Sequence, residues 1–134
     1  MTNEELINIA SSVINSKKLK DGTVGDVGCA LLSESGKIYT GVCVGVNSNG
    51  YCAERVAIAK MITDDHGFTI KKIVATWKDE NGVVYVIPPC GHCRQAMLET
   101  DESNIDKTEV ILDIDKSVVL KELLPYHDWW QKIG

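Results

Sequence analysis

Long apolar runs are absent from this sequence. No stretch of about eighteen consecutive residues is apolar, which argues against a transmembrane helix. A basic excess is also absent, because 14 lysines and arginines stand against 19 aspartates and glutamates and the formal net charge is -5. We therefore expect no general affinity for nucleic acid or for an anionic membrane. The first residues, MTNEELINIA, lack the basic and then apolar order of a secretory signal, so the expected location is the cytoplasm.

The residues that are present suit one folded domain. The chain has 134 residues, of which 44% are hydrophobic and 25% charged, enough apolar side chain for a sizeable core. No internal repeat, low-complexity tract or linker divides the sequence. We therefore expect a single domain over residues 1–134.

The hydrophobic pattern predicts a mixture of helices and strands. Patterns with helical spacing predict helices over residues 4–19, 52–63, 91–100 and 117–123. Runs rich in β-branched residues predict five strands, over residues 27–33, 37–44, 70–77, 83–87 and 109–113. The first two strands are expected to form an antiparallel hairpin and the later ones to be partly parallel. This order favours an α/β fold with a mixed sheet and helices on both faces.

The number and spacing of the cysteines point to metal chemistry. An odd count of five without a secretory signal argues against a disulfide framework. Cys29 and Cys43 lie in apolar runs, where a cysteine usually behaves as a small hydrophobic residue. The other three lie in two short segments, Cys52-Ala53-Glu54-Arg55 and Pro88-Pro89-Cys90-Gly91-His92-Cys93-Arg94-Gln95.

Each of these segments lies where a loop or strand gives way to a predicted helix. Backbone N–H groups at a helix start stabilise thiolates, and the thiolate is the form that binds metal. A catalytic zinc ion takes three protein ligands and leaves a fourth position open to water. Cys52, Cys90 and Cys93 supply that number. Glu54 follows the first ligand by two residues and can take a proton from the water and return it to a leaving nitrogen.

Charge also has to be balanced at such a site. Zinc with three thiolates is an anion, so neighbouring cations should withdraw charge from the sulfurs. Arg55 and Arg94 each adjoin a proposed ligand and are the candidates for this role. His92 is not expected to bind the metal, because a fourth protein ligand would close the site to water.

The two segments together resemble the zinc signature of the cytidine deaminase family, in which a glutamate that is not a ligand acts as acid and base. Weaker similarities at residues 36–41 and 122–125 extend the resemblance from about Val27 to Pro125. It implies a three-layer α/β/α fold around a five-stranded mixed sheet, one zinc ion per chain, and homotetramers in which subunits close each other's pockets. In the reaction that the resemblance implies, water attacks C4 of the pyrimidine, Glu54 protonates N3 and then the amine, and ammonia leaves. The resemblance implies conversion of cytidine or deoxycytidine to the uracil nucleoside, with the backbone near Ala53 and Cys90 helping to bind the base.

The sequence departs from this family where the sugar is held. Ordinary members carry an Asn-x-Glu element that binds ribose, whereas the residues here are Cys43, Val44 and Gly45. Blasticidin S deaminase, a relative that acts on a cytosine-bearing antibiotic, is similar in its short segment before Cys52 and in the Leu-Leu-Pro ending. The alternative is therefore a blasticidin S deaminase-like enzyme acting on a modified cytosine compound. The candidates for substrate contacts are Ala53, Cys43, Asn47, Tyr126 and Trp129.

Two alternatives belong to other classes of protein, and a third is a deaminase with a different substrate. Cys90-Gly91-His92-Cys93 matches a redox motif, but two prolines precede it and the redox reading leaves Cys52-Ala53-Glu54 unexplained. A structural zinc module would need a fourth protein ligand, either His92 or a distant cysteine. An editing deaminase acting on RNA or DNA is disfavoured by the acidic charge and the short chain.

Overall fold

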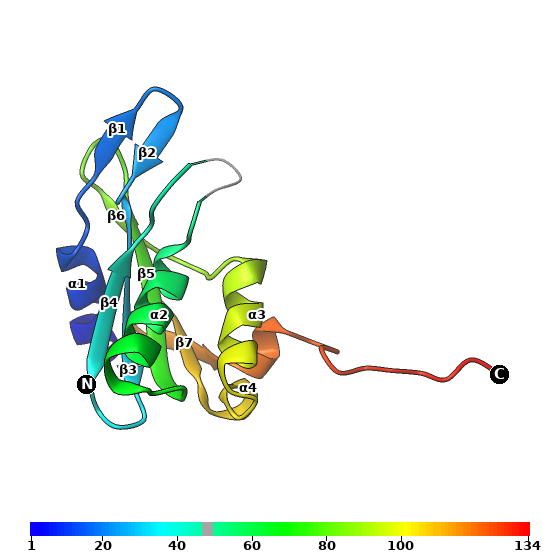
Figure 1. Cartoon of the computed structure of the whole chain (residues 1–134). Helices are drawn as coiled ribbons and strands as arrows, with labels where there is room; N and C mark the ends of the chain where they lie inside the picture. Colours follow the sequence, from blue (N-terminus) through cyan, green and yellow to red (C-terminus); the bar gives the residue numbers. More distant parts are fainter. Residues whose placement is uncertain (47–49) are drawn as a thin grey trace.

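The computed structural model describes residues 1–46 and 50–134, which form a sheet with helices on both faces (Figure 1). The helices are α1 (Asn3–Ser12), α2 (Ala53–Asp65), α3 (Gly91–Thr100), α4 (Asn104–Lys107) and the 3₁₀ helix η2 (Leu120–Leu123). The strands are β1 (Lys17–Leu19), β2 (Gly22–Val24), β3 (Val27–Ser33), β4 (Ile38–Val42), β5 (Ile70–Lys78), β6 (Val84–Ile87), β7 (Glu109–Asp113) and β8 (Lys116–Val119).

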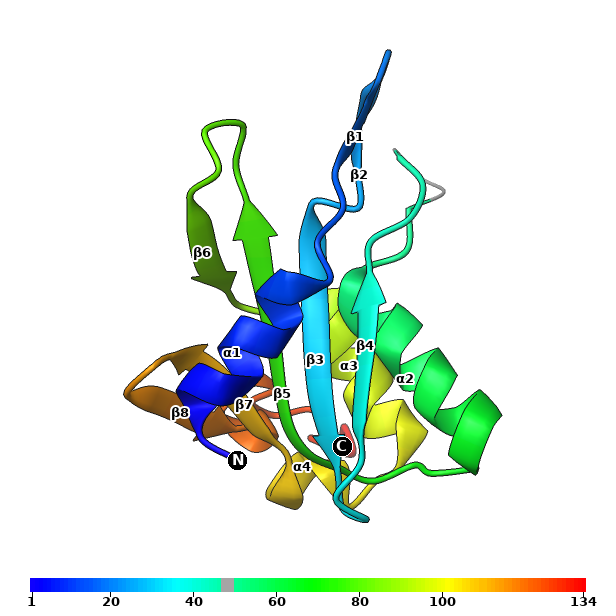
Figure 2. The same ribbon diagram turned by 90° about the vertical axis from the view of Figure 1, so that its left-hand side faces the viewer.

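The main sheet is mixed. Its strand order is β4-β3-β5-β7-β8, with β6 also paired to β5. Strand β3 is antiparallel to β4 and to β5, whereas β5 and β7 are parallel. Lys72 and Ile73 of β5 pair with β7, and residues 75–78 pair with β6. Strands β6 and β7 therefore occupy successive stretches of the same edge of β5, as Figure 2 shows.

Two hydrophobic clusters hold the three layers together. Helix α1 covers one face of the sheet, and helices α2 and α3 cover the other (Figure 2). The cluster under α1 contains Leu6, Ile7, Ala10, Ala30, Val74 and Ile111. The larger cluster under α2 and α3 includes Leu31, Ala57, Met61, Ile73, Met97 and Val110. The α/β/α class expected from the sequence is confirmed.

Gly41 on β4 lets α2 approach the sheet closely. A Cβ atom at this position would lie 2.7 Å from the Ala57 backbone nitrogen and 2.8 Å from the Ala53 carbonyl oxygen. Both atoms belong to helix backbone, which cannot move aside as a flexible side chain can. Because α2 begins with Ala53 and Glu54, this contact fixes the position of the segment that carries the proposed chemistry.

We expect Gly41→Ala to lower the free energy of unfolding by about 1–3 kcal/mol, because the added methyl group overpacks the contact between β4 and α2. Urea denaturation followed by circular dichroism measures the change. Gly91→Ala is the matched control, since a Cβ there meets no atom within 4 Å and α3 should be as stable as before. Equal stability of the two variants would contradict the role given to Gly41.

The N-terminal helix is shorter than the sequence pattern predicts. The expected helix over residues 4–19 ends at Ser12, and residues 17–19 form β1 in a two-stranded hairpin with β2. The Ser12 hydroxyl donates to the Ile9 carbonyl, and the Asn15 N–H donates to the Gly25 carbonyl at 2.9 Å. These side-chain and long-range hydrogen bonds compete with continuation of the helix.

The C-terminal part also differs from expectation. The helix expected over residues 117–123 is a strand followed by a short 3₁₀ helix, because residues 116–119 pair with β7. The β-branched Val118 and Val119 suit this strand. Strand β8 makes the main sheet six-stranded, where five strands were expected. Among the helices of the described residues, none has the length and apolar character needed to cross a bilayer.

Candidate active site

Two helix starts meet at the end of the sheet and bring the three cysteines of the two segments together. Cys52 is the N-cap residue of α2 and Cys90 is the N-cap residue of α3, both with extended backbone. Neither N-cap side chain is used in a capping hydrogen bond. Cys93 lies in the first turn of α3 and is buried. The three thiols therefore lie close together where the two helices begin.

The distances between the sulfur atoms suit a tetrahedral metal ion. The Sγ atoms of Cys52 and Cys90 are 3.5 Å apart, as are those of Cys90 and Cys93, and all three lie within 4.8 Å of one another. Thiolates bound to zinc at about 2.3 Å in tetrahedral directions are roughly 3.8 Å apart. The number, chemistry and spacing of the donors therefore fit zinc with one position left open.

Within the described residues this is the one group of three or more cysteine, histidine or acidic side chains placed to share a metal ion. The exposed His92 is not part of it. A closed structural site would need a fourth protein ligand, and the described part of the chain offers none here. All five cysteines are free thiols.

Glu54 lies beside the thiols at the bottom of the site. The residue is only 4% exposed, and this burial raises the pKa of the carboxyl above its ordinary value, although its own backbone N–H and the Cys93 thiol act in the opposite direction. A buried carboxyl group with a raised pKa is suited to accept and release a proton near neutral pH. Glu54 lies in the first turn of α2, close to the cysteines, but it is not one of the candidate ligands.

The thiols differ in how readily they ionise. Although burial acts to raise it, the pKa of Cys90 is lowered, because the Cys93 N–H and the neighbouring thiols stabilise its thiolate. Burial raises the pKa of Cys93, and the nearby Glu54 carboxylate adds to this effect. Burial also raises the pKa of Cys52, with the Arg55 guanidinium opposing the shift. Three thiolates in this pocket thus need a cation to hold them.

Arg55 connects the thiols to the preceding loop. Its Nη2 donates to the Gly50 carbonyl oxygen at 3.4 Å, and its guanidinium lies 5.3 Å from the centre of the Tyr51 ring. Interaction with the Cys52 thiol raises the pKa of Arg55. This arrangement suits the charge compensation expected of Arg55 and also ties the loop before Cys52 to helix α2.

The hydrogen bonds of Arg94 go to backbone carbonyl groups. Its Nε donates to Pro89 at 2.8 Å, and its Nη1 donates to Leu123 at 3.3 Å. Arg94 therefore joins the turn before Cys90 to the C-terminal helix η2. Charge compensation by Arg94 stays a prediction.

A pocket of about 140 Å³ opens beside the thiols. It is lined by Val27, Cys43, Cys52, Ala53, Glu54, Ile87, Pro88 and Cys90. Of the expected substrate contacts, Ala53 and Cys43 line this pocket, whereas Asn47 lies outside the described residues. Val27, Ile87 and Pro88 were not anticipated, because ordinary apolar residues in strands carry no signal of their own in a sequence.

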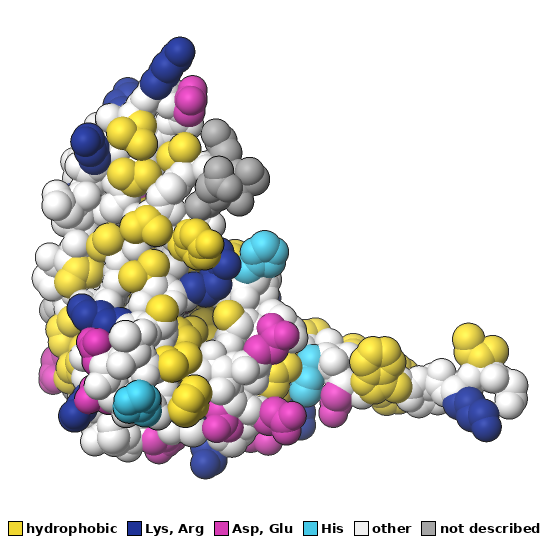
Figure 3. All heavy atoms as spheres, viewed as in Figure 1, with side chains coloured by type: hydrophobic (Ala, Val, Ile, Leu, Met, Phe, Trp, Pro, Cys, Tyr) yellow, Lys and Arg dark blue, Asp and Glu magenta, His cyan; other side chains and the backbone are white. Residues whose placement is uncertain are grey.

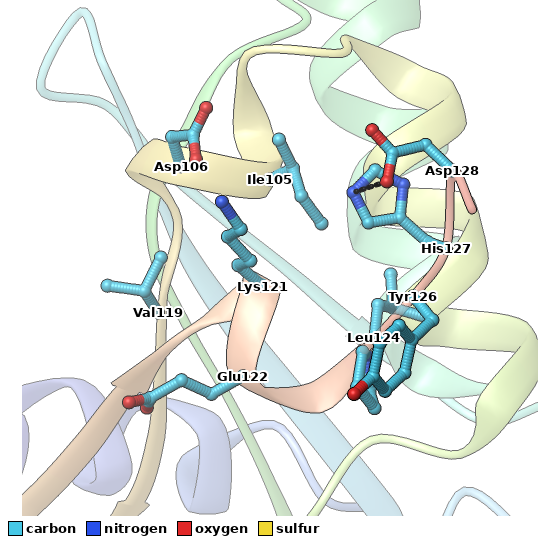
Figure 4. A pocket seen from close by; sticks show the side chains of 10 residues that line it. Ile105, Asp106, Val119, Lys121, Glu122, Leu124, Tyr126, His127 and Asp128 are labelled. Carbon is cyan, nitrogen blue, oxygen red and sulfur yellow. Dashed lines mark ion pairs between the residues drawn. The ribbon is translucent and has the colours of Figure 1, made fainter.

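Larger cavities lie on another part of the molecule. One of about 670 Å³ lies between η2, α4 and the start of the C-terminal segment, and Figure 4 shows Lys121, His127 and Asp128 around it. A neighbouring one of about 840 Å³ is lined mostly by polar residues of α3 and the turn after it. No cysteine lines either cavity. The smaller pocket is therefore the candidate active site, because it contains the reactive groups.

The aromatic C-terminal segment extends away from the body of the molecule, as Figures 1 and 3 show. Tyr126 and Trp129 are 78% and 64% exposed and contact each other edge to face, with ring centres 5.7 Å apart. Neither lines the pocket beside the thiols in the described part of this chain. A contact with substrate therefore stays a prediction that would require a neighbouring subunit.

The zinc-binding region that defines the cytidine and deoxycytidylate deaminases matches residues 1–108, which include all three clustered cysteines and Glu54. The chain belongs to this family. It is therefore a hydrolytic deaminase. A cytidine deaminase of Sporosarcina psychrophila is 37% identical over 105 residues, which cover 74% of this chain and 71% of that protein.

Solved structures support the same assignment. The cytidine deaminase of Mycobacterium tuberculosis is similar with a TM-score of 0.71 and 25% identity, over 91% of this chain and 93% of that chain. The enzyme of Burkholderia pseudomallei is similar with a TM-score of 0.68 and 26% identity, over 93% of this chain and 98% of that chain. The fold expected from the resemblance is thus found along almost the whole chain.

Proposed function

We propose that this enzyme deaminates the cytosine ring of cytidine or deoxycytidine and releases ammonia, with one zinc ion per chain bound by Cys52, Cys90 and Cys93. The observation that carries the proposal is the position of the buried Glu54 beside three clustered thiols, on a pocket the size of one ring. The relatives described as cytidine deaminases support the choice of ring.

Each group at the pocket has a role in the proposed reaction. Zinc, when bound, would act as a Lewis acid and lower the pKa of a water molecule to about 7. Glu54 takes one proton from the attacking water and delivers it to N3 of the ring. It then takes the second proton, as the new hydroxyl on C4 becomes a carbonyl, and delivers it to the amino group, whose bond to C4 breaks so that ammonia leaves. Ala53 and the backbone at Cys90 bind the ring. Arg55 offsets the charge of the thiolates.

Further properties belong to this proposal. A homotetramer would cover the exposed aromatic side chains of the C-terminal segment, among them Trp130, which is 87% exposed. The reduced thiols that a zinc site requires suit the cytoplasm. The substrate is a small molecule, and no nucleic acid or membrane takes part.

A second substrate class is favoured by one observation. Cys43, which stands where ordinary cytidine deaminases have the asparagine of their ribose-binding element, lines the pocket and donates its thiol hydrogen to Asp26 at 3.3 Å. Because the sugar would here meet Cys43 and not an asparagine, the pocket would also suit a cytosine compound with a different sugar, such as blasticidin S.

A substrate panel tests the proposal. Purified zinc-loaded protein is incubated with cytidine, deoxycytidine, blasticidin S and free cytosine, and ammonia release is measured. We expect turnover of at least one nucleoside. Turnover of blasticidin S alone would select the second class, and the absence of ammonia from every compound while zinc is bound would refute the proposal.

A further inference from the structure

Asp26 directly precedes β3 and contacts the lining of the pocket beside the thiols. Its Oδ1 accepts a hydrogen bond from the Cys43 thiol at 3.3 Å, and its Oδ2 accepts one from the Trp77 indole Nε1 at 3.0 Å. Both Cys43 and Val27, the residue after Asp26, line the pocket. The carboxylate is thus fixed at two points on the strand side of the site.

The Asp26 carboxylate can accept more hydrogen bonds than these two. A carboxylate offers about four lone-pair positions, and each oxygen of Asp26 has one hydrogen-bond donor in the described structure. The residue is half-buried, so one side of it is open to solvent. A group that emerges from the pocket beside Cys43 would meet a charged hydrogen-bond acceptor.

The pocket is too small for a whole nucleoside. A cavity of roughly 150 Å³ accommodates a single six-membered ring such as benzene, and this pocket has about 140 Å³. A cytosine ring with C4 toward the thiols therefore leaves its substituent outside. Asp26 and Trp77 also line a second cavity of about 460 Å³, and we take the substituent to extend toward it.

The charges around this second cavity disfavour an anion. Three carboxylates line it, those of Asp26, Asp79 and Glu80, together with the ammonium groups of Lys18 and Lys78. Lys18, Lys78 and Glu80 are exposed, so solvent and salt screen their charges, whereas Asp26 and Asp79 are half-buried and are screened less. Among these charged side chains, Asp26 accepts a hydrogen bond from Cys43, which lines the small pocket. A hydroxyl group next to Asp26 gains a charge-assisted hydrogen bond, whereas a phosphate group is repelled.

We infer that Asp26 determines specificity by accepting a hydrogen bond from a hydroxyl on the substituent of the cytosine ring and by repelling a phosphate there. The enzyme then selects a nucleoside over a nucleoside 5′-phosphate. Membership of a family whose description covers both cytidine and deoxycytidylate leaves this choice open. The inference rests on the proposed function, because it takes the ring to lie in the pocket beside Glu54.

Equilibrium binding in a variant that cannot turn over tests the inference. Zinc-loaded Glu54→Gln is titrated with deoxycytidine and with deoxycytidine 5′-phosphate, a pair that differs only in the phosphate. We expect deoxycytidine to bind at least about tenfold more tightly. Adding Asp26→Asn should weaken the binding of deoxycytidine and strengthen the binding of deoxycytidine 5′-phosphate. The ratio of the two Kd values should then change by about tenfold or more. Asp26→Glu, which keeps the charge, should restore most of the preference.

Two controls separate specificity from a structural effect. Trp77→Phe removes the indole donor but keeps the carboxylate, so the preference for the nucleoside should remain. The Kd of 1-methylcytosine, which has neither hydroxyl nor phosphate, should not respond to Asp26→Asn. An unchanged Kd ratio in Asp26→Asn, or no binding of either nucleoside ligand, would overturn the inference. Failure of the proposed function is seen separately, as the absence of ammonia from the wild-type enzyme.

Discussion

Glu54→Gln is expected to lower kcat for cytidine deamination on the order of 10³-fold while the protein keeps its zinc. A positioned proton-transfer group typically contributes a factor of 10² to 10⁴, and the amide of glutamine cannot take up and return the proton. Glu54 is buried beside the thiols but is not one of the clustered ligands, so metal binding should be unaffected. Steady-state ammonia release and zinc analysis of the same sample provide the two measurements.

Glu99→Gln is the matched control for this substitution. Glu99 lies on α3 and is exposed, so the same chemical change there should leave kcat unchanged. If Glu54→Gln retained full activity, proton transfer by Glu54 would be refuted. The result also bears on the alternative of a structural zinc module, for which Glu54→Gln should change neither zinc content nor any other property.

Cys52→Ala is expected to abolish both zinc binding and activity. The substitution removes one of three thiols whose sulfur atoms lie within 4.8 Å of one another, and two remaining protein ligands are fewer than a catalytic zinc site normally has. We expect the zinc content, measured by atomic absorption on protein purified under reducing conditions, to fall from one ion per chain to a small fraction of that. Ammonia release from cytidine should fall to background.

Cys29→Ala shows whether the loss is specific to the cluster. Cys29 is fully buried in the core below the site and is not one of the three clustered thiols. This variant should keep one zinc ion and lose only stability, by about 1 kcal/mol for a small change of buried volume. The redox alternative would be favoured by two results together. The wild-type protein would bind no zinc under reducing conditions, and Cys52→Ala would be as active as the wild type.

Local sequence was sufficient to predict the elements that carry the ligands. Cys52 is the first residue of the helix expected over residues 52–63, and Cys90 directly precedes the helix expected over residues 91–100; the structure places each at an N-cap. Helix starts are encoded by nearby residues, which is why they can be read from a short window. The three ligands and Glu54 could be proposed for the same reason, because the spacing within each segment already fixes which side chains share a helix start.

Elements that depend on distant partners were predicted less well. Residues 17–19 continue a helical pattern in the sequence, but in the structure they pair with β2. The Asn15 N–H, just before them, donates to the Gly25 carbonyl. Residues 116–119 were assigned to a helix, but they pair with β7 and form the sixth strand of the sheet. Hydrogen bonds to another strand override a weak local preference, and a sequence window does not contain the partner.

The sequence by itself thus determined the family, the candidate metal ligands and the candidate acid–base residue, because these depend on residue types at short, fixed spacings. Tertiary structure decided what surrounds them. It brought Asp26 against Cys43 and Trp77, which are 17 and 51 residues away along the chain, and it directed Arg94 toward Leu123. These contacts arise where strands and helices from distant segments converge, so the substrate side of the pocket could be seen only after the chain was folded.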